Sequence, residues 1–387
     1  MANNKSHSTT ILIPARNAAS TIERAIKSAA GERPESILLL DHASTDETVA
    51  IARKNGGDLV SVIDATKCSS LAAVRQLGLQ SVETEYGIWL DADDGFVSGR
   101  VSNLIGLLEK SSADLAFDQA ILVDETWKNK LSKLKFPVFL TENTVCRIYE
   151  RNYLPSHWPA FRSAAAKEIT FDPLMKSCED YDFHLRAFSS GLRFAFDTNF
   201  GYFHTDTPNS LSRNIALNEE SISFALRKIS YDSLNRYYEE ANLSNEVSLW
   251  ATVLIATQRK EYELALKELQ SIASSDKVLE PEGPFPFPED WRIAFHKGVI
   301  SLLVGDSELA EKALCKAVSL KENSAESLNN LGVAYRIRGK EREAQNCFER
   351  AFAEFPEYSD ARANLQLDSN NRITKLPIRI HSSRSVY

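Results

Sequence analysis

The chain has 387 residues, of which 43% are hydrophobic and 25% are charged, and its formal net charge is −8. This length suits two or three compact domains, and the acidic balance argues against general nucleic-acid binding. The five cysteines form no CxxC pair, which fits reduced thiols and offers no zinc site. The sequence shows no secretory signal and no run near the about 18 apolar residues of a membrane span. We therefore expect a cytoplasmic protein without a transmembrane segment, or one held peripherally at the inner membrane face.

Residues 1–214 alternate short apolar runs with amphipathic segments, which predicts an α/β domain with a mostly parallel sheet. The runs are apolar throughout, as in strands that are covered on both faces. Capping-box sequences at 20–23 and 44–47 predict the starts of two helices. The expected strands are 10–14, 36–41, 58–64 and 86–91.

Carboxylates follow two of these predicted strands. Asp41 ends one of them, and Asp91, Asp93 and Asp94 end another. Ligands of parallel sheets collect at the carboxyl ends of the strands. Three neighbouring carboxylates repel one another, so the cluster either lies in water or surrounds a cation such as Mn²⁺ or Mg²⁺.

From about residue 215 the apolar spacing becomes helical, and small residues recur 34 residues apart. The recurring pairs are Gly298 and Gly332, Gly305 and Gly339, Ala310 and Ala344, and Ala317 and Ala351. The fullest unit, 328–360, resembles the tetratricopeptide repeat. We expect a helical domain over 215–370, with a Pro-rich loop or linker at 280–291, that either binds peptides or forms a homodimer. The basic tail 371–387 either contacts an anionic surface or is a solvated terminus.

Five motifs follow one another along the first domain: ILIPARN, LLDHASTDET, GIWLDADD, FDPLMKSCEDYDFHLR and GYFHTDTPNSLSR. In this order they resemble a family 2 glycosyltransferase of the GT-A fold, over about residues 9–214. The resemblance implies transfer of a sugar from a nucleotide-diphosphate donor, with a UDP-sugar favoured. A nucleotidyltransferase or a dinucleotide dehydrogenase fits less well, because no Gly-rich phosphate loop follows the first predicted strand.

The resemblance also implies residue roles in donor binding. The nucleotide-sugar residues would be Pro14, Arg16, Asp41, His42, Arg75, Asp91, Ala92 and Asp93. The metal ligands for Mn²⁺ or Mg²⁺ would be Asp93, Asp94 and His204. His42 departs from the family, which often has an acid there, so the choice of nucleotide stays open. Asp41 as a turn residue and Arg75 in an ion pair are the simpler structural alternatives.

Asp180 corresponds to the catalytic base, with Glu179 beside it to orient it or to contact the acceptor. Acids at a helix N-terminus that interact with the helix dipole are the alternative explanation. Trp158 falls where an acceptor sugar would bind, although a core tryptophan fits equally well.

The sequence thus predicts an inverting, metal-dependent glycosyltransferase with a peptide, protein or glycan acceptor. A peptide acceptor is suggested by analogy with bacterial glycosyltransferases that carry helical repeats. The alternatives are a transferase of lipid-linked surface polysaccharide and a catalytically degenerate scaffold whose helical repeats bind peptides.

Overall fold

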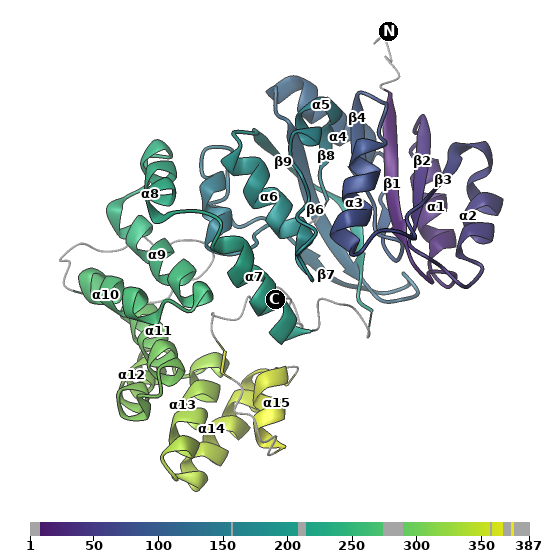
Figure 1. The fold of residues 1–387 in the computed structure, drawn as a ribbon. Coiled ribbons are helices and arrows are strands. Elements are labelled where there is room, and N and C mark those ends of the chain that lie inside the picture. The colour runs from purple at the N-terminus through teal and green to yellow at the C-terminus, as the bar shows by residue number, and fades with distance from the viewer. Residues whose placement is uncertain are drawn as a thin grey trace. The chain divides into compact units, whose positions relative to one another are not determined.

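The structure is a computed structural model that describes residues 8–155, 158–207, 214–273, 289–356, 358–366 and 373–374. The chain divides into two compact units, Met1–Lys228 and Ile229–Tyr387 (Figure 1). Helix α7 (Ile215–Leu226) belongs to the first unit, which therefore continues past residue 214. Most of the segment 280–291 and of the tail 371–387 lies outside the described residues.

The first unit is built on one nine-stranded sheet with the order β3-β2-β1-β4-β8-β6-β9-β5, in which β7 pairs with β6. Strands β1 to β4 pair in parallel, as the sequence predicts, and β8 adds to β4 in the antiparallel direction. The strands are β1 Thr9–Ala15, β2 Ser36–Asp41, β3 Val60–Asp64, β4 Tyr86–Trp89, β5 Gly95–Phe96, β6 Leu115–Val123, β7 Lys130–Leu134, β8 Ala160–Arg162 and β9 Phe194–Thr205.

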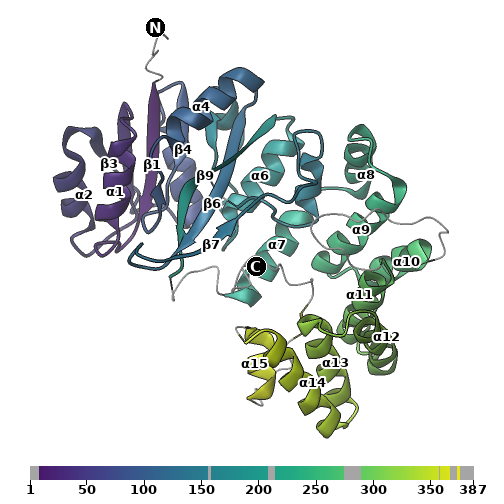
Figure 2. The same ribbon diagram turned by 180° about the vertical axis from the view of Figure 1, so that it is seen from behind.

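Helices cover both faces of this sheet (Figures 1 and 2). Ile11 and Ile13 of β1 share one buried cluster with residues of α1 and α4. On the other face, α3 approaches so closely that a Cβ on Gly78 would lie 2.5 Å from Leu40 and 2.9 Å from Trp89. The helices are α1 Ile22–Gly31, α2 Thr48–Gly56, η1 Gly57–Leu59, α3 Leu71–Gln80, α4 Arg100–Ser111, η2 Val145–Tyr149, α5 Ser163–Lys167 and α6 Glu179–Ser189.

The capping boxes predicted at 20–23 and 44–47 are wrong, because neither α1 nor α2 has a side-chain hydrogen bond at its N-cap. The polar side chains of these segments instead join the loops that follow β1 and β2. The side chain of Asn17 accepts a hydrogen bond from the backbone N–H of Thr45 at 2.8 Å, and Ser44 accepts one from the N–H of Asn17 at 3.0 Å. These bonds fix the two loops against each other.

The second unit is helical, and its successive helices α11 to α15 pack on one another. The recurring glycines allow the close approach that the repeat predicts. A Cβ on Gly298 would lie 2.4 Å from Leu314, and one on Gly332 would lie 2.5 Å from Phe348. The helices are α8 Tyr231–Glu240, α9 Asn245–Arg259, α10 Tyr262–Ala273, α11 Glu289–Leu303, α12 Ser307–Leu320, α13 Ala325–Ile337, α14 Glu341–Glu354 and α15 Ser359–Leu365.

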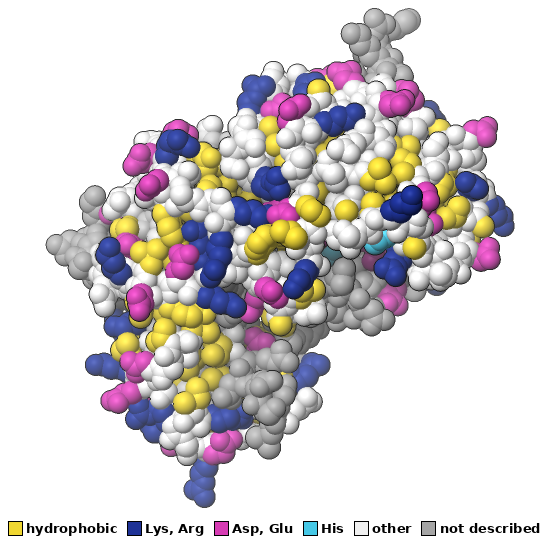
Figure 3. All heavy atoms as spheres, in the orientation of Figure 1, with side chains coloured by type: hydrophobic (Ala, Val, Ile, Leu, Met, Phe, Trp, Pro, Cys, Tyr) yellow, Lys and Arg dark blue, Asp and Glu magenta, His cyan; other side chains and the backbone are white. Residues whose placement is uncertain are grey.

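The surface of the molecule mixes both signs of charge. On the face drawn in Figure 3, Lys and Arg side chains lie among Asp and Glu side chains over each unit. Within the described part of the chain, no helix is long and apolar enough to cross a bilayer.

Candidate active site

The candidate site lies at the carboxyl ends of the parallel strands β1, β2 and β4. Here the backbone adopts the left-handed region at residues other than glycine. Asn17 follows β1 with φ 51°, Ala43 follows β2 with φ 58°, and Cys178 precedes α6 with φ 55°. Such conformations cost about 1–3 kcal/mol each and gather at functional sites, where the surrounding structure holds them in place.

The buried guanidinium group of Arg75 joins three segments of this site. Arg75 of α3 is 3% exposed and donates from Nη2 to Asp91 Oδ1 at 2.7 Å. Its Nε donates to Glu179 Oε1 at 3.0 Å. Burial raises the pKa of Glu179, and the charge of Arg75 opposes this shift. Arg75 therefore holds the start of α6, with Glu179 and Asp180, beside the end of β4.

Trp158 contacts both Asp91 and Arg75 of this network. Its indole Nε1 donates to Asp91 Oδ2 at 3.1 Å, and the guanidinium carbon of Arg75 lies 3.8 Å from the ring centroid. The side chain is 1% exposed. This burial is what the core alternative expects, and the acceptor role of Trp158 stays a prediction. The indole N–H positions Asp91.

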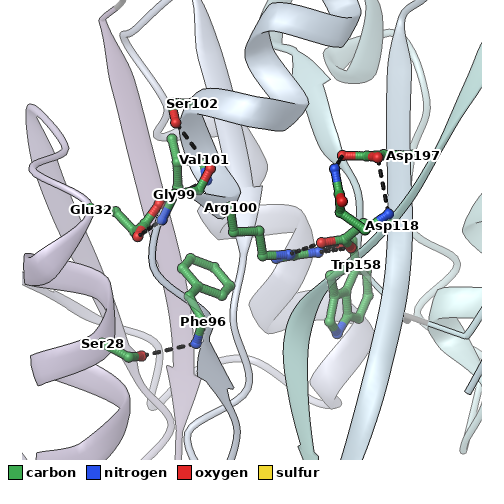
Figure 4. Close-up of polar contacts among 11 residues, drawn as sticks. Ser28, Glu32, Phe96, Gly99, Arg100, Val101, Ser102, Asp118, Trp158 and Asp197 are labelled. Atoms are coloured by element: carbon green, nitrogen blue, oxygen red, sulfur yellow. Dashed lines mark hydrogen bonds and ion pairs between the residues drawn. The ribbon is translucent and has the colours of Figure 1, made fainter. Parts of the chain in front are cut away.

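The main chain of Trp158 is fixed as well (Figure 4). Arg100 of α4 donates from Nη2 to the carbonyl oxygen of Trp158 at 2.7 Å. The same guanidinium forms a paired contact with Asp118 of β6, with N–O distances of 2.8 and 2.9 Å. Both charged side chains are buried, and paired geometry of this kind is what makes a buried ion pair tolerable.

Asp94 is the buried carboxylate of the cluster. It accepts hydrogen bonds from the hydroxyl of Tyr202 at 2.8 Å and from the backbone N–H of Thr205 at 2.7 Å. The Nδ1 atom of His204 lies 3.5 Å from the same carboxylate. Burial acts to raise the pKa of Asp94, but His204 and these hydrogen bonds outweigh it and lower the pKa. Asp94 and His204 thus attach β9 to the end of β4.

Asp93 differs from Asp91 and Asp94 in the contacts of its carboxylate. Among the described residues, its carboxylate accepts no hydrogen bond from another residue and forms no ion pair, whereas its carbonyl oxygen accepts from Thr205 Oγ1 at 2.6 Å. Burial and the charges of Asp94 and Asp91 raise the pKa of Asp93 to about 7. A partly buried carboxylate among like charges is a site where a divalent cation would be stabilised.

The expected metal ligands Asp93, Asp94 and His204 do not form a complete binding site. In the described part of the chain, no group of three or more His, Cys, Asp or Glu side chains is placed to hold a metal ion. Asp94 is occupied by Tyr202 and Thr205, which leaves Asp93 as the carboxylate that fits a metal. Mg²⁺ and Mn²⁺ in nucleotide sites often take only one or two carboxylates and complete their shell with substrate phosphate.

Four of the expected nucleotide residues lie at the ends of β1 and β2: Pro14, Arg16, Asp41 and His42. Asp41 accepts from the backbone N–H of Ser44 at 3.2 Å, which is the turn role left as its alternative. The Nε2 atom of His42 lies 3.0 Å from the carbonyl oxygen of Cys68, so this nitrogen carries the proton and Nδ1 is the acceptor. Of the other expected residues, Pro14 is buried in β1, Arg16 is exposed, and Ala92 packs against the core.

Several positioning residues were not predicted from the sequence. Tyr202 and Thr205 flank the predicted His204, and their motif was recognised without a role for either one. Arg100 and Asp118 belong to no recognised motif, so only their distance in the folded chain identifies them. Cys178 has the left-handed backbone that turns the chain into α6, which a cysteine in the sequence does not signal.

Two family models match this chain. Residues 10–170 match the family model described as Glycosyl transferase family 2, and residues 325–358 match a tetratricopeptide repeat model. Residues 10–170 form a family 2 glycosyltransferase domain. The glycosyltransferase is followed by at least one tetratricopeptide repeat, formed by α13 and α14. The segment with Glu179 and Asp180 and the motif 201–213 lie beyond the matched residues.

The chain is similar to curated bacterial proteins. It is 23% identical to succinoglycan biosynthesis protein ExoO of Rhizobium meliloti over 66% of this chain and 78% of the relative. It is 28% identical to succinoglycan biosynthesis protein ExoU of the same species, over 52% of this chain and 63% of the relative. A third relative, 31% identical over 26% of this chain and 40% of the relative, is the Escherichia coli UDP-Glc:alpha-D-GlcNAc-diphosphoundecaprenol beta-1,3-glucosyltransferase WfaP.

Among solved structures, S. aureus TarS residues 1–349 in complex with UDP-GlcNAc matches with a TM-score of 0.50 and 16% identity. The match covers 91% of this chain and 93% of that one. At this identity the likeness shows the fold, which is the GT-A fold that the motifs predict.

Proposed function

We propose that the chain transfers a sugar, with inversion, from a UDP-sugar to a saccharide acceptor in surface-polysaccharide assembly. The proposal is supported by the bridge that Arg75 forms between Asp91 and Glu179, the residue next to Asp180 in the chain. The names of the relatives, two succinoglycan biosynthesis proteins and a glucosyltransferase that acts on a diphosphoundecaprenol-linked sugar, favour a glycan acceptor over the peptide expected by analogy.

In this proposal the donor binds at the carboxyl ends of the parallel strands. His42 presents Nδ1 as an acceptor for an N–H of the nucleotide base, which suits uracil. Asp93 would hold Mn²⁺ or Mg²⁺ together with the donor diphosphate, and a bound ion would supply positive charge for the leaving group. Asp91, held by Arg75 and Trp158, is fixed in orientation before the donor arrives, which lowers the entropy lost on binding.

Asp180 acts as the base in this account. Glu179 is fixed to Arg75, so its carboxylate stays with the guanidinium while Asp180 faces the acceptor. As the acceptor oxygen bonds to the anomeric carbon, the bond from that carbon to the diphosphate oxygen breaks, and Asp180 takes the acceptor proton. Attack from the face opposite the leaving group inverts the anomeric configuration. A degenerate scaffold would not need this set of oriented carboxylates.

Donor hydrolysis tests the proposal without knowledge of the acceptor. The purified chain is incubated with UDP-, GDP- and dTDP-sugars and 1H NMR follows the released sugar and nucleotide. We expect slow release of UDP from one UDP-sugar, dependent on Mn²⁺ or Mg²⁺ and stopped by EDTA, with the first sugar anomer inverted. A released sugar that keeps the anomeric configuration of the donor, or equal release of UDP in EDTA, would contradict the proposed function.

A further inference from the structure

A chain of buried amide side chains crosses helices α13 and α15 of the second unit. Asn329, Asn330 and Asn364 are each 0% exposed. Asn364 donates to Asn329 Oδ1 at 2.8 Å, and Asn329 donates to Asn330 Oδ1 at 3.2 Å. Asn330 and Asn364 stand at equivalent positions, 34 residues apart, in successive repeats. The bond from Asn329 fixes the orientation of the Asn330 amide group.

The amide group of Asn330 also hydrogen-bonds the main chain of Thr374, which follows the repeats in the sequence. Its Nδ2 donates to the carbonyl oxygen of Thr374 at 2.8 Å, and its Oδ1 accepts from the N–H of Thr374 at 2.9 Å. One amide side chain thus pairs with both backbone groups of one residue, as a neighbouring β-strand would. This contact requires an extended backbone and no particular side chain.

Side-chain contacts add selectivity at the same place. The Thr374 hydroxyl donates to Asp360 Oδ2 at 2.7 Å and also contacts the Tyr358 hydroxyl. Both partners are buried at the start of α15. Ile373 packs against the apolar cluster of α11 to α14. The surroundings therefore suit an aliphatic residue followed by a residue with a β-hydroxyl.

We propose that Asn330, Asp360 and Tyr358 form a binding site for an extended peptide segment, which the chain fills in cis with its own Ile373–Thr374. Buried amides and carboxylates are costly unless they are hydrogen-bonded, so the site requires such a segment. An extended segment of the same chemistry, supplied from outside, competes for the site. The inference concerns the second unit and does not depend on the proposed sugar transfer.

The test uses the full chain and a fluorescent peptide with the sequence of residues 371–379, NRITKLPIR. Thr374→Pro removes the N–H and the hydroxyl that hold the segment, and so vacates the site. By fluorescence anisotropy, we expect the peptide to bind this variant at least tenfold more tightly than wild type. Adding Asn330→Ala should weaken that binding at least tenfold, and a peptide with valine for threonine should also bind more weakly.

Equal binding to wild type and Thr374→Pro, or binding that Asn330→Ala leaves unchanged, would overturn the proposal. If Thr374→Pro does not fold, as judged by circular dichroism, hydrogen exchange of the wild-type chain decides. The amide of Thr374 should exchange slowly, and excess unlabelled peptide should accelerate it. A protected amide that saturating peptide does not release contradicts an exchangeable site. A wild-type dimer that Thr374→Pro dissociates would show that the segment binds in trans.

Discussion

Asp180→Asn is expected to lower kcat for sugar transfer about 1000-fold, within the range that a positioned general base contributes. Asparagine keeps the size of the side chain and cannot take the acceptor proton. The proposed donor contacts lie at the ends of β2 and β4, so the KM for the donor should stay close to that of wild type. Steady-state transfer at varied donor concentration, with the acceptor saturating, measures both constants.

Asp182 provides a matched control for this substitution, two residues further along the same helix. Its buried carboxylate accepts from Lys228 Nζ at 2.6 Å and is a structural ion pair. Asp182→Asn should lower the melting temperature and leave kcat of the folded protein near the wild-type value. If Asp182→Asn lowered kcat as much as Asp180→Asn, the loss would reflect damage to α6 and not the removal of a base.

Arg75→Met should destabilise the fold by about 3 kcal/mol and also lower kcat/KM, because removal of one partner leaves buried charges uncompensated. Asp91 and Glu179 would then repel each other without the cation between them. Methionine fills a similar volume and stays against Trp158, so the loss reports mainly on the charge. Urea unfolding monitored by tryptophan fluorescence gives the stability, and donor hydrolysis gives the activity.

The double variant Arg75→Met/Glu179→Gln separates the two effects. Neutralising Glu179 removes one of the unpaired charges and should recover part of the lost stability. Activity should not recover, because α6 is no longer tied to the end of β4. A single variant as stable as wild type, or a double variant less stable than the single one, would contradict the bridging role of Arg75.

The sequence predicted the parallel strands β1 to β4 because they are short, largely apolar runs, but it did not predict strands β5 to β9 of the nine-stranded sheet. It also predicted which carboxylates would lie at the strand ends. It did not predict their different partners. Asp91, Asp93 and Asp94 look alike in the chain, whereas the fold pairs the first with Arg75, buries the third against β9, and gives the carboxylate of the second no ion pair among the described residues.

Other errors have the same origin in long-range contacts. The segments at 20–23 and 44–47 have the composition of helix caps, but their neighbouring loops compete for the same hydrogen bonds. Trp158 could be core or acceptor from the sequence, and its hydrogen bonds with Asp91 and Arg100 appear only in the folded chain. Local sequence patterns therefore predict helices and strands. The contacts of the site side chains depend on residues that are distant in the sequence, so the patterns do not predict them.

We propose that the end of β4 binds a nucleoside diphosphate through a divalent ion on Asp93. Isothermal titration of UDP into the wild-type chain, with Mn²⁺ and then with EDTA, tests this proposal, with Asp93→Asn as the comparison. We predict that Mn²⁺ tightens UDP binding at least tenfold in wild type and has little effect in Asp93→Asn. Equal UDP affinity with Mn²⁺ and with EDTA, or the same Mn²⁺ effect in both proteins, would contradict the proposal.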